Sequence, residues 1–452
     1  MKPLLKVFCM ILIASLLLSA LIGCSSGENA QTGTNTGSGD SVSSPVTIKI
    51  WGGVPEDMGP LDLVEAFNEK NTDIKLEYYR YVNDEQGNLK LDTSLMAGED
   101  IDAYFSYWDE LIVKRVDAGM AEDLTPYMEQ DGFNMEENYG DAYFKYKDTV
   151  YAIPTAEELI FIYCNKKMFD DAGIPIPADW TMEEYRDITK RLTKEVNGNK
   201  VYGGGANEWE NVWKNLFHTQ LLGPNSFYKQ DGTSNFDNKA FKDSLQFMKD
   251  IMTVDNSHMS LIEVQSSKLT PYGEFLNQKT ATVAVSAWIT RNIKDTEKYP
   301  HDFVTALAPF PALEKGKPDY GWAGLNNYLM MNKNSKNKEA AWQAIKFWGT
   351  EGQLYMCKAG KVPSWKKIDQ EEAMKAMLGD NPEELFDVDS YKRTIFQNQS
   401  KRFVNTETIA YPEIVKVWKE ETEKVIGANK DIDQALSDVK KRADEIIANA
   451  RR

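Results

Sequence analysis

The chain has 452 residues, a formal net charge of −17 and only three histidines. A chain this acidic repels nucleic-acid phosphates unless one basic patch neutralises them, and it contains no such run, so we expect no nucleic-acid partner. The length allows two or three domains. The 11 Trp and 21 Tyr, with few His and Cys, favour an extracytoplasmic binding surface over a metal or thiol enzyme. The histidines at 218, 258 and 301 lack metal-ligand spacing, and we expect no cofactor.

The N-terminal segment has the pattern of an export signal followed by a tether. Lys2 and Lys6 precede an apolar run at 7–18 that is too short for a comfortable membrane span. Leu21-Ile22-Gly23-Cys24 resembles the bacterial lipobox, so we expect a lipoprotein signal peptide at 1–23 and lipidation of the Cys24 thiol. The Ser-, Gly- and Thr-rich stretch up to residue 45 predicts a lipid-anchored flexible linker at 24–45.

From residue 46 onward, strand-like and helix-like segments alternate, which predicts an α/β fold with mainly parallel sheets. Strands are expected at 46–51, 74–79, 102–108, 159–164, 281–288 and 328–331. Apolar residues recur with helical spacing at 61–67, 182–192, 241–252, 338–348 and 432–448. Thr181 with Glu184 three residues later predicts a capped helix start.

Three of the predicted strands end in tryptophan, at Trp51, Trp108 and Trp288. In open α/β sheets, ligands bind in the crevice beyond the carboxyl ends of the strands. The flat face of an indole matches the C–H face of a pyranose ring, and its edge N–H can still donate a hydrogen bond. We therefore expect the three rings to line one cleft, the alternative being that each ring covers its own core.

Four stretches, in order along the chain, resemble bacterial extracellular solute-binding proteins of family 1, of the maltose-binding-protein-like carbohydrate type. The most characteristic begins with Tyr151-Ala152-Ile153-Pro154 and continues through LIFIYCNKKMFDDAGIPIPADWTMEEY. The others are LMAGEDIDAYFSYWDELIVKRVDAGMAEDLTPY, GEFLNQKTATVAVSAW, and SKNKEAAWQAIKFWGTEGQ with Lys361-Val362-Pro363 after it. In the third stretch, Asn-Gln-Lys stands where Gly-Lys is usual.

The resemblance covers nearly all of the chain from Val46 to Ala448 and implies a type II periplasmic-binding-protein-like fold. In this fold, two α/β lobes joined by crossover strands close on a ligand by hinge bending. The expected crossovers lie near 153–165 and 288–311. The expected lobes are an N-terminal one at 46–155 plus 290–345 and a C-terminal one at 156–289 plus 346–452.

Candidate ligand contacts lie first at the strand ends and in the first crossover. Trp51 precedes Gly52-Gly53, where absent side chains let a ligand approach the backbone. Trp108 and Asp109 stand where family members often place an aromatic residue and a carboxylate, although Asp109 also suits a helix N-cap. The resemblance places a cleft acid at Glu158. Its neighbour Glu157 would point the other way in an extended segment, and we retain both as candidates.

Further candidates lie later in the chain. Trp288 resembles the stacking aromatic of sugar-binding members, and Arg291 could clamp a carboxylate or hydroxyls, the alternative being a surface charge. The glycine-flanked Trp209 and Trp322 have little core to join, which favours contact with a ligand. Trp418 resembles a position that reaches the cleft in some members, but helix packing is the favoured role.

The resemblance implies a binding protein that is not an enzyme and that faces the extracytoplasmic side of the cell membrane, held by its lipid anchor. It would capture a carbohydrate, most simply an oligosaccharide, as a monomer, and deliver it to the transmembrane subunits of an ABC permease with their ATPase. A secreted carbohydrate-active hydrolase and a polyamine or amino-acid receptor of the same fold remain alternatives. We expect Cys164 and Cys357 to be free buried thiols.

Overall fold

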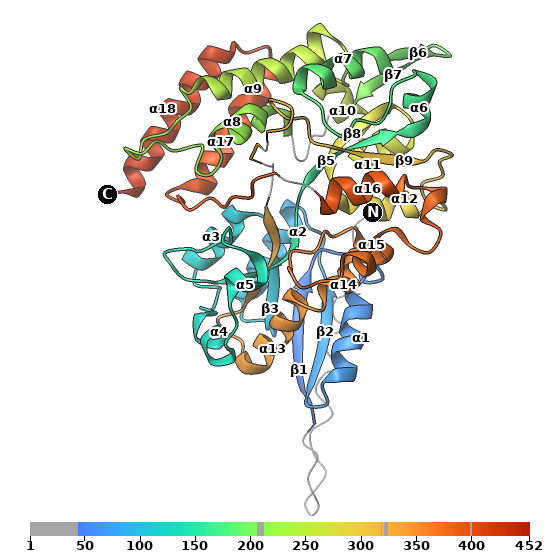
Figure 1. Ribbon diagram of the computed structural model, residues 1–452. Helices are drawn as coiled ribbons and strands as arrows, with labels where there is room; N and C mark the ends of the chain where they lie inside the picture. Colours follow the sequence, from blue (N-terminus) through green and yellow to red (C-terminus); the bar gives the residue numbers. More distant parts are fainter. Residues whose placement is uncertain (1–43, 206–211, 318, 321–323, 398–399) are drawn as a thin grey trace, which may run out of the picture. The chain divides into compact units, whose positions relative to one another are not determined.

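The computed structural model describes residues 44–452 except 206–211, 318, 321–323 and 398–399. The predicted signal peptide, Cys24 and nearly all of the predicted linker lie outside the described residues. The body from Pro45 onward forms one compact unit. It contains two five-stranded sheets, each covered by helices (Figure 1).

The first sheet has the strand order β2-β1-β3-β10-β4. Its strands are β1 (Val46–Gly52), β2 (Ile74–Arg80), β3 (Ala103–Ser106), β4 (Ala152–Glu157) and β10 (Leu325–Met331). Strand β1 is parallel to β2 and β3, whereas β10 is antiparallel to both β3 and β4. Strands β1, β3 and β4 therefore run in the same direction, and their carboxyl ends share one edge of the sheet.

Helices on both faces of the first sheet bury its apolar side chains. They are α1 (Pro60–Lys70), α2 (Glu85–Met96), α3 (Asp109–Asp117), α4 (Thr125–Asp131), α5 (Met135–Tyr139), α13 (Lys338–Gly349) and α14 (Gln353–Met356). In β1 the alternate residues Ile48 and Ile50 are fully buried, and they join a core with Leu63 and Phe67 of α1. The alternation of apolar residues in this strand and the helical spacing in α1 therefore point into one core.

The second sheet has the order β6-β7-β8-β5-β9 and is mixed rather than mainly parallel. Its strands are β5 (Ile160–Asn165), β6 (Lys194–Val196), β7 (Asn199–Gly204), β8 (Thr280–Ser286) and β9 (Thr305–Pro309). The central strand β5 is antiparallel to both β8 and β9. The expectation of mainly parallel sheets was wrong here, because β5 enters this sheet directly from the first one and runs against its neighbours.

Both faces of the second sheet are buried. Ile160 and Ile162 of β5 enter one core, while Phe161 and Tyr163 enter the other. The covering helices are α6 (Lys166–Asp171), α7 (Met182–Leu192), α8 (Leu216–Leu222), α9 (Lys239–Lys249), α10 (Leu261–Ser267), α11 (Pro271–Leu276), α12 (Thr290–Lys294), α15 (Gln370–Leu378), α16 (Val388–Phe396), α17 (Tyr411–Gly427) and α18 (Ile432–Ala450). Short helical turns are η1 (Val212–Asn215), the π-turn η2 (Asp250–Val254), η3 (Ala287–Ile289), η4 (Cys357–Ala359) and η5 (Pro382–Glu384).

Most of the predicted elements are confirmed. Helix α7 begins at Met182, and Thr181 and Glu184 form the predicted capping box. The helix expected at 241–252 is α9, which continues into the π-turn η2. Strands β4, β6, β7 and β9 are absent from the list of predicted strands. The α/β, two-sheet architecture is the one that the resemblance implied.

The chain passes between the two sheets by links that differ in length. Strand β4 ends at Glu157 and β5 begins at Ile160, so Glu158 and Leu159 alone form the first link, within the predicted crossover. The second link was predicted at 288–311, but β9 at 305–309 still pairs with β5. The passage back to the first sheet therefore lies between Pro309 and Leu325.

The predicted lobe boundaries need the same correction. Residues 290–309 were expected in the first lobe, but α12 and β9 pack with the second sheet. Residues 346–356 were expected in the second lobe, but Trp348 and Met356 belong to the core of the first. The physical reason is that β9 completes the edge of the second sheet, whereas α13 covers β10 and β4 of the first.

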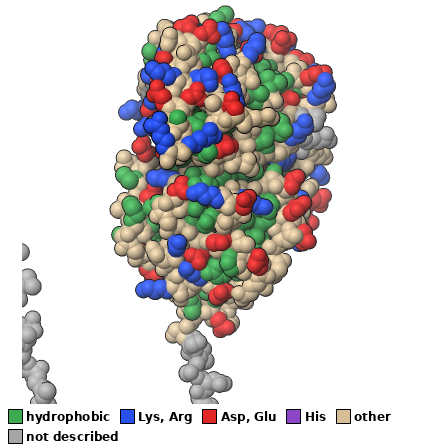
Figure 2. All heavy atoms as spheres, turned by 90° about the vertical axis from the view of Figure 1, so that its left-hand side faces the viewer, with side chains coloured by type: hydrophobic (Ala, Val, Ile, Leu, Met, Phe, Trp, Pro, Cys, Tyr) green, Lys and Arg blue, Asp and Glu red, His purple; other side chains and the backbone are tan. Residues whose placement is uncertain are grey.

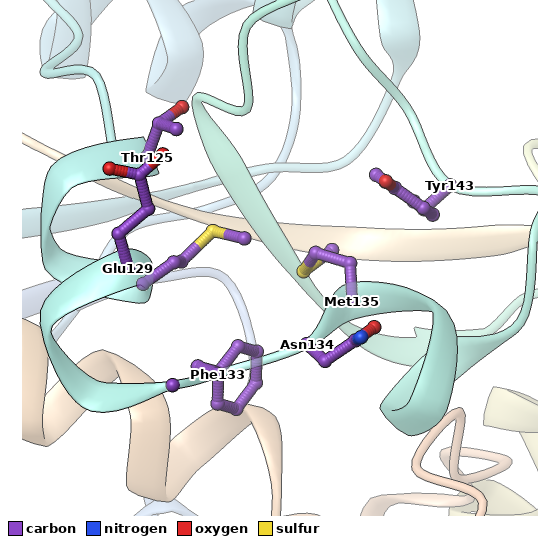
Figure 3. A pocket seen from close by; sticks show the side chains of 8 residues that line it. Thr125, Glu129, Phe133, Asn134, Met135 and Tyr143 are labelled. Carbon is purple, nitrogen blue, oxygen red and sulfur yellow. The ribbon is translucent and has the colours of Figure 1, made fainter.

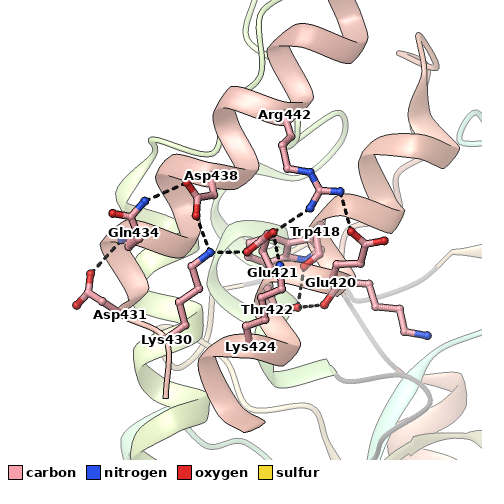
Figure 4. Close-up of polar contacts among 11 residues, drawn as sticks. Trp418, Glu420, Glu421, Thr422, Lys424, Lys430, Asp431, Gln434, Asp438 and Arg442 are labelled. Carbon is pink, nitrogen blue, oxygen red and sulfur yellow. Dashed lines mark hydrogen bonds and ion pairs between the residues drawn. The ribbon is translucent and has the colours of Figure 1, made fainter. Parts of the chain in front are cut away.

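A charge cluster around the buried Glu421 carboxylate joins the two C-terminal helices to each other (Figure 4). The Glu421 carboxylate on α17 accepts hydrogen bonds from Lys424 at 2.7 Å, Lys430 at 2.6 Å and Arg442 at 2.8 Å. Burial opposes ionisation, but these three cations outweigh it and lower the pKa of Glu421 to about 2. Because Arg442 comes from α18, the cluster holds α17 in place, and α17 begins at the edge that faces the first lobe.

No helix among the residues that the structure describes is long and apolar enough to cross a membrane. Figure 2 shows one face of the protein, on which Lys and Arg side chains are interspersed with Asp and Glu. On this face the net acidity does not form a single-sign field.

Candidate ligand-binding site

The carboxyl ends of the strands in the two sheets meet at the first link. In the second sheet, β7 is parallel to β8, and β8 and β9 are both antiparallel to β5. The start of β5 therefore lies beside the ends of β8 and β9, in the pairs Ile160 with Ser286 and Phe161 with Pro309. Because two residues separate β4 from β5, the carboxyl edge of the first sheet directly adjoins the carboxyl edge of the second. This junction is where open α/β sheets bind ligands.

Tyr107 and Trp108 form the wall of the first lobe, immediately after β3. Tyr107 is buried, and its hydroxyl accepts a hydrogen bond of 2.7 Å from the backbone N–H of Gly53, just after β1. Trp108 packs edge-on against the Tyr107 ring with centroids 6.5 Å apart, and it remains 44% exposed. The backbone at Gly53 has no room for a larger residue, because an added Cβ would lie 2.8 Å from the Asn83 side chain. The ends of β1 and β3 are thus locked together under an exposed indole.

A buried arginine fixes the direction of this strand end from below. Arg115 of α3 donates to the carbonyl oxygen of Phe105 at 3.0 Å and to the Ser106 hydroxyl at 2.7 Å. It also pairs with Asp92 at 2.8 Å and donates to Asn88 of α2 at 2.9 Å. With four acceptors satisfied, this buried cation joins β3, α2 and α3 into one rigid support for Trp108.

Asp109 and Glu110 follow Trp108 at the start of α3, and neither forms an ion pair in the described part of the chain. Burial raises the pKa of Asp109 to about 7, and the neighbouring charge of Glu110 adds to the rise. Burial also raises the pKa of Glu110. Both carboxylates act electrostatically on Tyr411, the first residue of α17 in the second lobe. The expected alternative, Asp109 as an N-cap, is wrong, because Trp108 occupies the cap position and Asp109 is the first helical residue.

Trp51 lies near the end of β1, the strand paired with β3, but its ring packs on its own sheet. It stacks on Tyr79 of β2 with centroids 6.3 Å apart, and the Lys90 ammonium lies 5.8 Å from its ring centre. The ring is partly buried against the first core. The described ring contacts join Trp51 to β2 and α2, and none joins it to Trp108 or Trp288.

Glu157, at the end of β4, and Glu158, in the first link, have different surroundings. Glu157 accepts a 2.6 Å hydrogen bond from Arg402, and its backbone N–H bonds to Val362. Glu158 is in the link itself, where its backbone N–H bonds to Gly324 and its carboxylate lies 3.4 Å from the Lys361 ammonium. Glu158 also acts electrostatically on Arg291 of the second lobe. Both carboxylates therefore lie beside a cation, Arg402 for Glu157 and Lys361 for Glu158, and Glu158 in addition interacts electrostatically with Arg291 of the second lobe.

Trp288 and Arg291 form the facing wall in the second lobe. Trp288 lies in η3, after β8, and packs edge-on against Tyr272 with centroids 5.9 Å apart. The Arg291 guanidinium lies over the Trp288 ring at 5.4 Å from its centre. Burial lowers the pKa of Arg291, which Glu158 and the phenol of Tyr107 counteract. Because Tyr107 belongs to the first lobe, Arg291 links the two walls electrostatically.

The remaining candidates divide between undescribed and buried positions. Trp209 and Trp322 lie outside the described residues. Trp418 is buried, and its indole N–H donates to Asn215 at 2.7 Å, so the favoured helix-packing role is confirmed. Sequence reasoning missed Tyr107, Tyr272, Tyr411 and Lys361. Tyr107 could have been found from its place beside Trp108, whereas nothing in the local pattern marks Tyr272.

The titratable residues that often carry chemistry are structural here. His218 stacks on Phe241 with centroids 4.3 Å apart, and burial lowers its pKa to about 3. His258 hydrogen-bonds Tyr185 at 2.8 Å. Cys164 and Cys357 are buried and unpaired, as predicted. Among the described residues there is no cluster of His, Cys, Asp or Glu suited to a metal ion.

Two surface hollows lie apart from this junction. One, of about 350 Å³, is bounded by side chains of α4 and α5, among them Thr125, Phe133 and Met135 (Figure 3). The other, of about 380 Å³, lies beside β7 at Tyr202 and Glu263. Neither contains a predicted site residue, and neither combines contributions from both sheets.

Comparison with known structures shows the fold of this chain. The ABC substrate-binding protein from Listeria monocytogenes in complex with cycloalternan superposes with a TM-score of 0.73 at 20% identity, over 89% of this chain and 99% of that one. The maltose/maltodextrin-binding domain from Bdellovibrio bacteriovorus bound to maltotriose gives 0.66 at 20% identity, over 89% and 100%. The sugar-binding protein from Xanthomonas citri gives 0.68 at 18% identity, over 90% and 98%.

Sequence comparison gives the family. A candidate binding protein of Brucella abortus is 24% identical over 298 residues, which are 63% of this chain and 67% of that protein. Residues 60–354, well over half of the chain, match the family described as bacterial extracellular solute-binding protein. The chain therefore belongs to the bacterial extracellular solute-binding proteins, and it has their two-lobed α/β fold.

Proposed function

We propose that this protein is the receptor of an ABC importer and that it captures an oligosaccharide between its lobes. The observation that carries the proposal is the pair of tryptophans at facing strand ends, Trp108 in the first lobe and Trp288 in the second, around Tyr107 and Arg291. Aromatic rings bind the C–H faces of sugar rings, and the carboxylates of Asp109 and Glu158 accept hydrogen bonds from hydroxyl groups. Two separated stacking surfaces suit a ligand of more than one sugar ring.

Capture works through closure of the lobes. A ligand that contacts both walls binds the closed form more tightly than the open form, and it shifts the equilibrium by that difference in free energy. The two-residue link at Glu158 and Leu159 places a hinge directly beside the walls. The permease then recognises the closed form, and the ligand is passed on without chemical change.

The family and the N-terminal sequence support a proposal for the surrounding assembly. The structural relatives named above include proteins in complex with cycloalternan and with maltotriose, which supports a saccharide as the ligand here. The partners are the transmembrane subunits of an ABC permease with their ATPase. The protein acts as a monomer outside the cytoplasmic membrane, to which lipidated Cys24 anchors it. The lobes proposed for closure are 46–157 plus 325–356 and 160–309 plus the helices after residue 360.

The test is a thermal-shift and tryptophan-fluorescence screen of the chain from Ser25 onward against oligosaccharides of several linkages, monosaccharides and polyamines. A ligand at 100 times its Kd stabilises the folded state by about 2.7 kcal/mol, which is readily seen. We expect an oligosaccharide to give the largest shift and to be recovered intact after prolonged incubation. A polyamine as the best ligand, or consumption of the oligosaccharide, would contradict the proposal.

A pair of variants ties the response to the site. Trp288→Ala removes one stacking surface and should weaken oligosaccharide binding about 30-fold, the size of an interface hot spot of about 2 kcal/mol. Tyr127→Ala is the control, because this partly buried ring on α4 packs against Trp342 in the first core. The control should lower the melting temperature while leaving Kd unchanged. Equal Kd values for wild type and Trp288→Ala would show that the ligand does not stack there.

A further inference from the structure

Arg291 is a half-buried cation whose hydrogen-bonding groups have no partner within the described part of the protein. It lies on α12, one turn after Trp288, with its guanidinium carbon 5.4 Å from the centre of that ring. No hydrogen bond or ion pair with a described residue engages its five N–H donors. This environment therefore favours the prediction that Arg291 binds a ligand over the alternative that it is an ordinary surface charge.

Neighbouring cations differ from Arg291 in this respect. Arg402 is bound to Glu157 at 2.6 Å, and Lys361 lies 3.4 Å from Glu158. Lys294, on the same helix as Arg291, donates to the carbonyl oxygen of Lys358 at 3.1 Å. These cations are held by groups of the protein itself, whereas the charge of Arg291 is left for something that enters from outside.

The surroundings of Arg291 make its positive charge energetically unfavourable unless an anion lies beside it. Burial disfavours the charged form of Arg291, and Arg80 at the end of β2 adds repulsion. Glu158 provides a compensating field but no hydrogen bond. A half-buried ion that lacks a hydrogen-bonded counterion is unfavourable, and a ligand anion in contact with the guanidinium would relieve this cost.

Resting on the proposed function, we propose that the oligosaccharide carries a carboxylate, as in a uronic acid, and that Arg291 binds this group. The planar guanidinium fork matches a carboxylate with two parallel N–H···O bonds, which a neutral hydroxymethyl group cannot offer. Trp288 meets the guanidinium on one face, and the remaining surface of this partly buried ring packs on the sugar ring that bears the acid. At the other wall, the carboxyl groups of Asp109 and Glu110 can form hydrogen bonds with hydroxyl groups but provide no cation, so the acidic sugar takes the Arg291 end of the ligand.

The experiment uses pairs of trisaccharides of equal length and linkage that differ in the oxidation of carbon 6. The pairs are α-1,4-galactotriose with trigalacturonate, β-1,4-mannotriose with trimannuronate, and cellotriose with its glucuronic acid counterpart. Calorimetry at pH 7 and low salt gives Kd for each ligand with the wild-type chain from Ser25 onward. A charge-assisted bidentate contact should make the acidic member of the recognised pair about 10 to 100 times tighter.

Variants of Arg291 assign the preference to this residue. In Arg291→Gln the ratio of the two Kd values should fall to about 1, and in Arg291→Lys it should be intermediate, because the charge remains but the fork is lost. Arg191→Gln removes an exposed arginine of α7 and should leave the ratio unchanged. Both Kd values in a ratio are measured with the same variant. A lower fraction of folded protein therefore affects both values equally and does not change their ratio.

The outcomes separate this inference from the proposed function. Tighter binding of an acidic trisaccharide, abolished in Arg291→Gln and retained in Arg191→Gln, supports both. Equal or weaker binding of every acidic member, with a neutral trisaccharide bound, overturns the carboxylate proposal and leaves the oligosaccharide receptor standing. A preference for the acid that survives in Arg291→Gln overturns the assignment to Arg291. Binding of no saccharide, with a polyamine or amino acid bound instead, overturns both.

Discussion

Trp418 lies on α17 and Trp108 caps α3, two helices that contact each other across the lobes, yet the surroundings of the two rings are opposite. Trp418 on α17 is 2% exposed, packs on Phe236 and Phe241, and donates its N–H to Asn215. Trp108 at the cap of α3 is 44% exposed and rests on Tyr107 alone among described rings. The comparison shows that the role of a tryptophan depends on its position relative to the helical repeat. A tryptophan on the apolar face of a helix stabilises the core, whereas one outside the repeat can contact a ligand.

The sequence context explains the difference. Trp418 shares a helical face with Ile414, Val417 and Val425, all of which are buried, so the helix directs it inward. Trp108 stands outside the repeat of α3, with extended backbone, at the point where a strand becomes a helix. Neither the alternation of the strand nor the repeat of the helix directs a side chain at such a junction into the core, so it can face a ligand.

The largest effect is expected from truncating the buried member of the pair. Trp418→Ala opens a cavity and removes one of the hydrogen bonds to Asn215, which should lower the free energy of unfolding by about 3 to 5 kcal/mol. Urea unfolding followed by circular dichroism measures this. Trp418→Phe is the matched control, since it retains most of the packing and loses only the N–H. If Trp418→Ala instead left the stability unchanged and weakened ligand binding, Trp418 would be a binding residue and not a core residue.

The exposed member should show the converse. Trp108→Ala should weaken oligosaccharide binding by about 2 kcal/mol, or roughly 30-fold in Kd, because a stacking surface of the cleft is lost. Its urea midpoint should stay close to that of the wild type, since a half-exposed ring contributes little to the core. Calorimetry with the ligand found in the screen provides Kd. A large loss of stability with Kd unchanged would place Trp108 among the core residues.

The acid beside Trp108 should make stability depend on pH in an unusual direction. The pKa of Asp109 is raised from 3.8 to about 7, so the folded state binds more protons than the unfolded state between these values. The contribution of Asp109 to stability therefore falls as pH rises from about 4 to about 7. Relative to the wild type, Asp109→Asn should become progressively more stable over this range in urea unfolding. Asp57→Asn, which removes an exposed carboxylate, is the control for the loss of one negative charge.

The smallest effect should distinguish Glu157, at the end of β4, from Glu158, in the link. Glu158→Gln should weaken oligosaccharide binding by about 1 kcal/mol, the value of one hydrogen bond, because this carboxylate faces the Arg291 wall. Glu157→Gln breaks the ion pair with Arg402 and should cost at most about 1 kcal/mol of stability. Parallel calorimetry and urea unfolding of the two variants test the split. The reverse pattern would mean that Glu157 is the ligand contact.

Much of the fold follows from local patterns. The capping box at Thr181, the period of α18 and the alternation in β1 each predict an element that the structure contains. Strand β9 escaped because the segment at 305–309 is short, ends in proline and gains its strand character only from pairing with β5. That omission displaced the predicted second crossover, since long-range pairing is invisible to a local pattern.

The candidate site was predictable to a similar degree. Trp108 and Trp288 follow from the rule of strand ends, but the same rule gave Trp51, whose ring stacks on Tyr79 instead. The difference lies in side-chain direction within the pleat, which depends on the neighbouring strand. Tyr272 reaches Trp288 from another helix, a contact that only the tertiary fold creates.

The two buried thiols have a practical consequence for observing closure. In a chain that begins at Ser25, Cys164 and Cys357 are the only cysteines, and burial raises the pKa of both thiols far above neutrality. Such thiols react slowly with maleimides. A cysteine placed on each lobe surface could therefore carry a pair of fluorescent dyes without removal of the native residues, and energy transfer between the dyes would report lobe motion in single molecules.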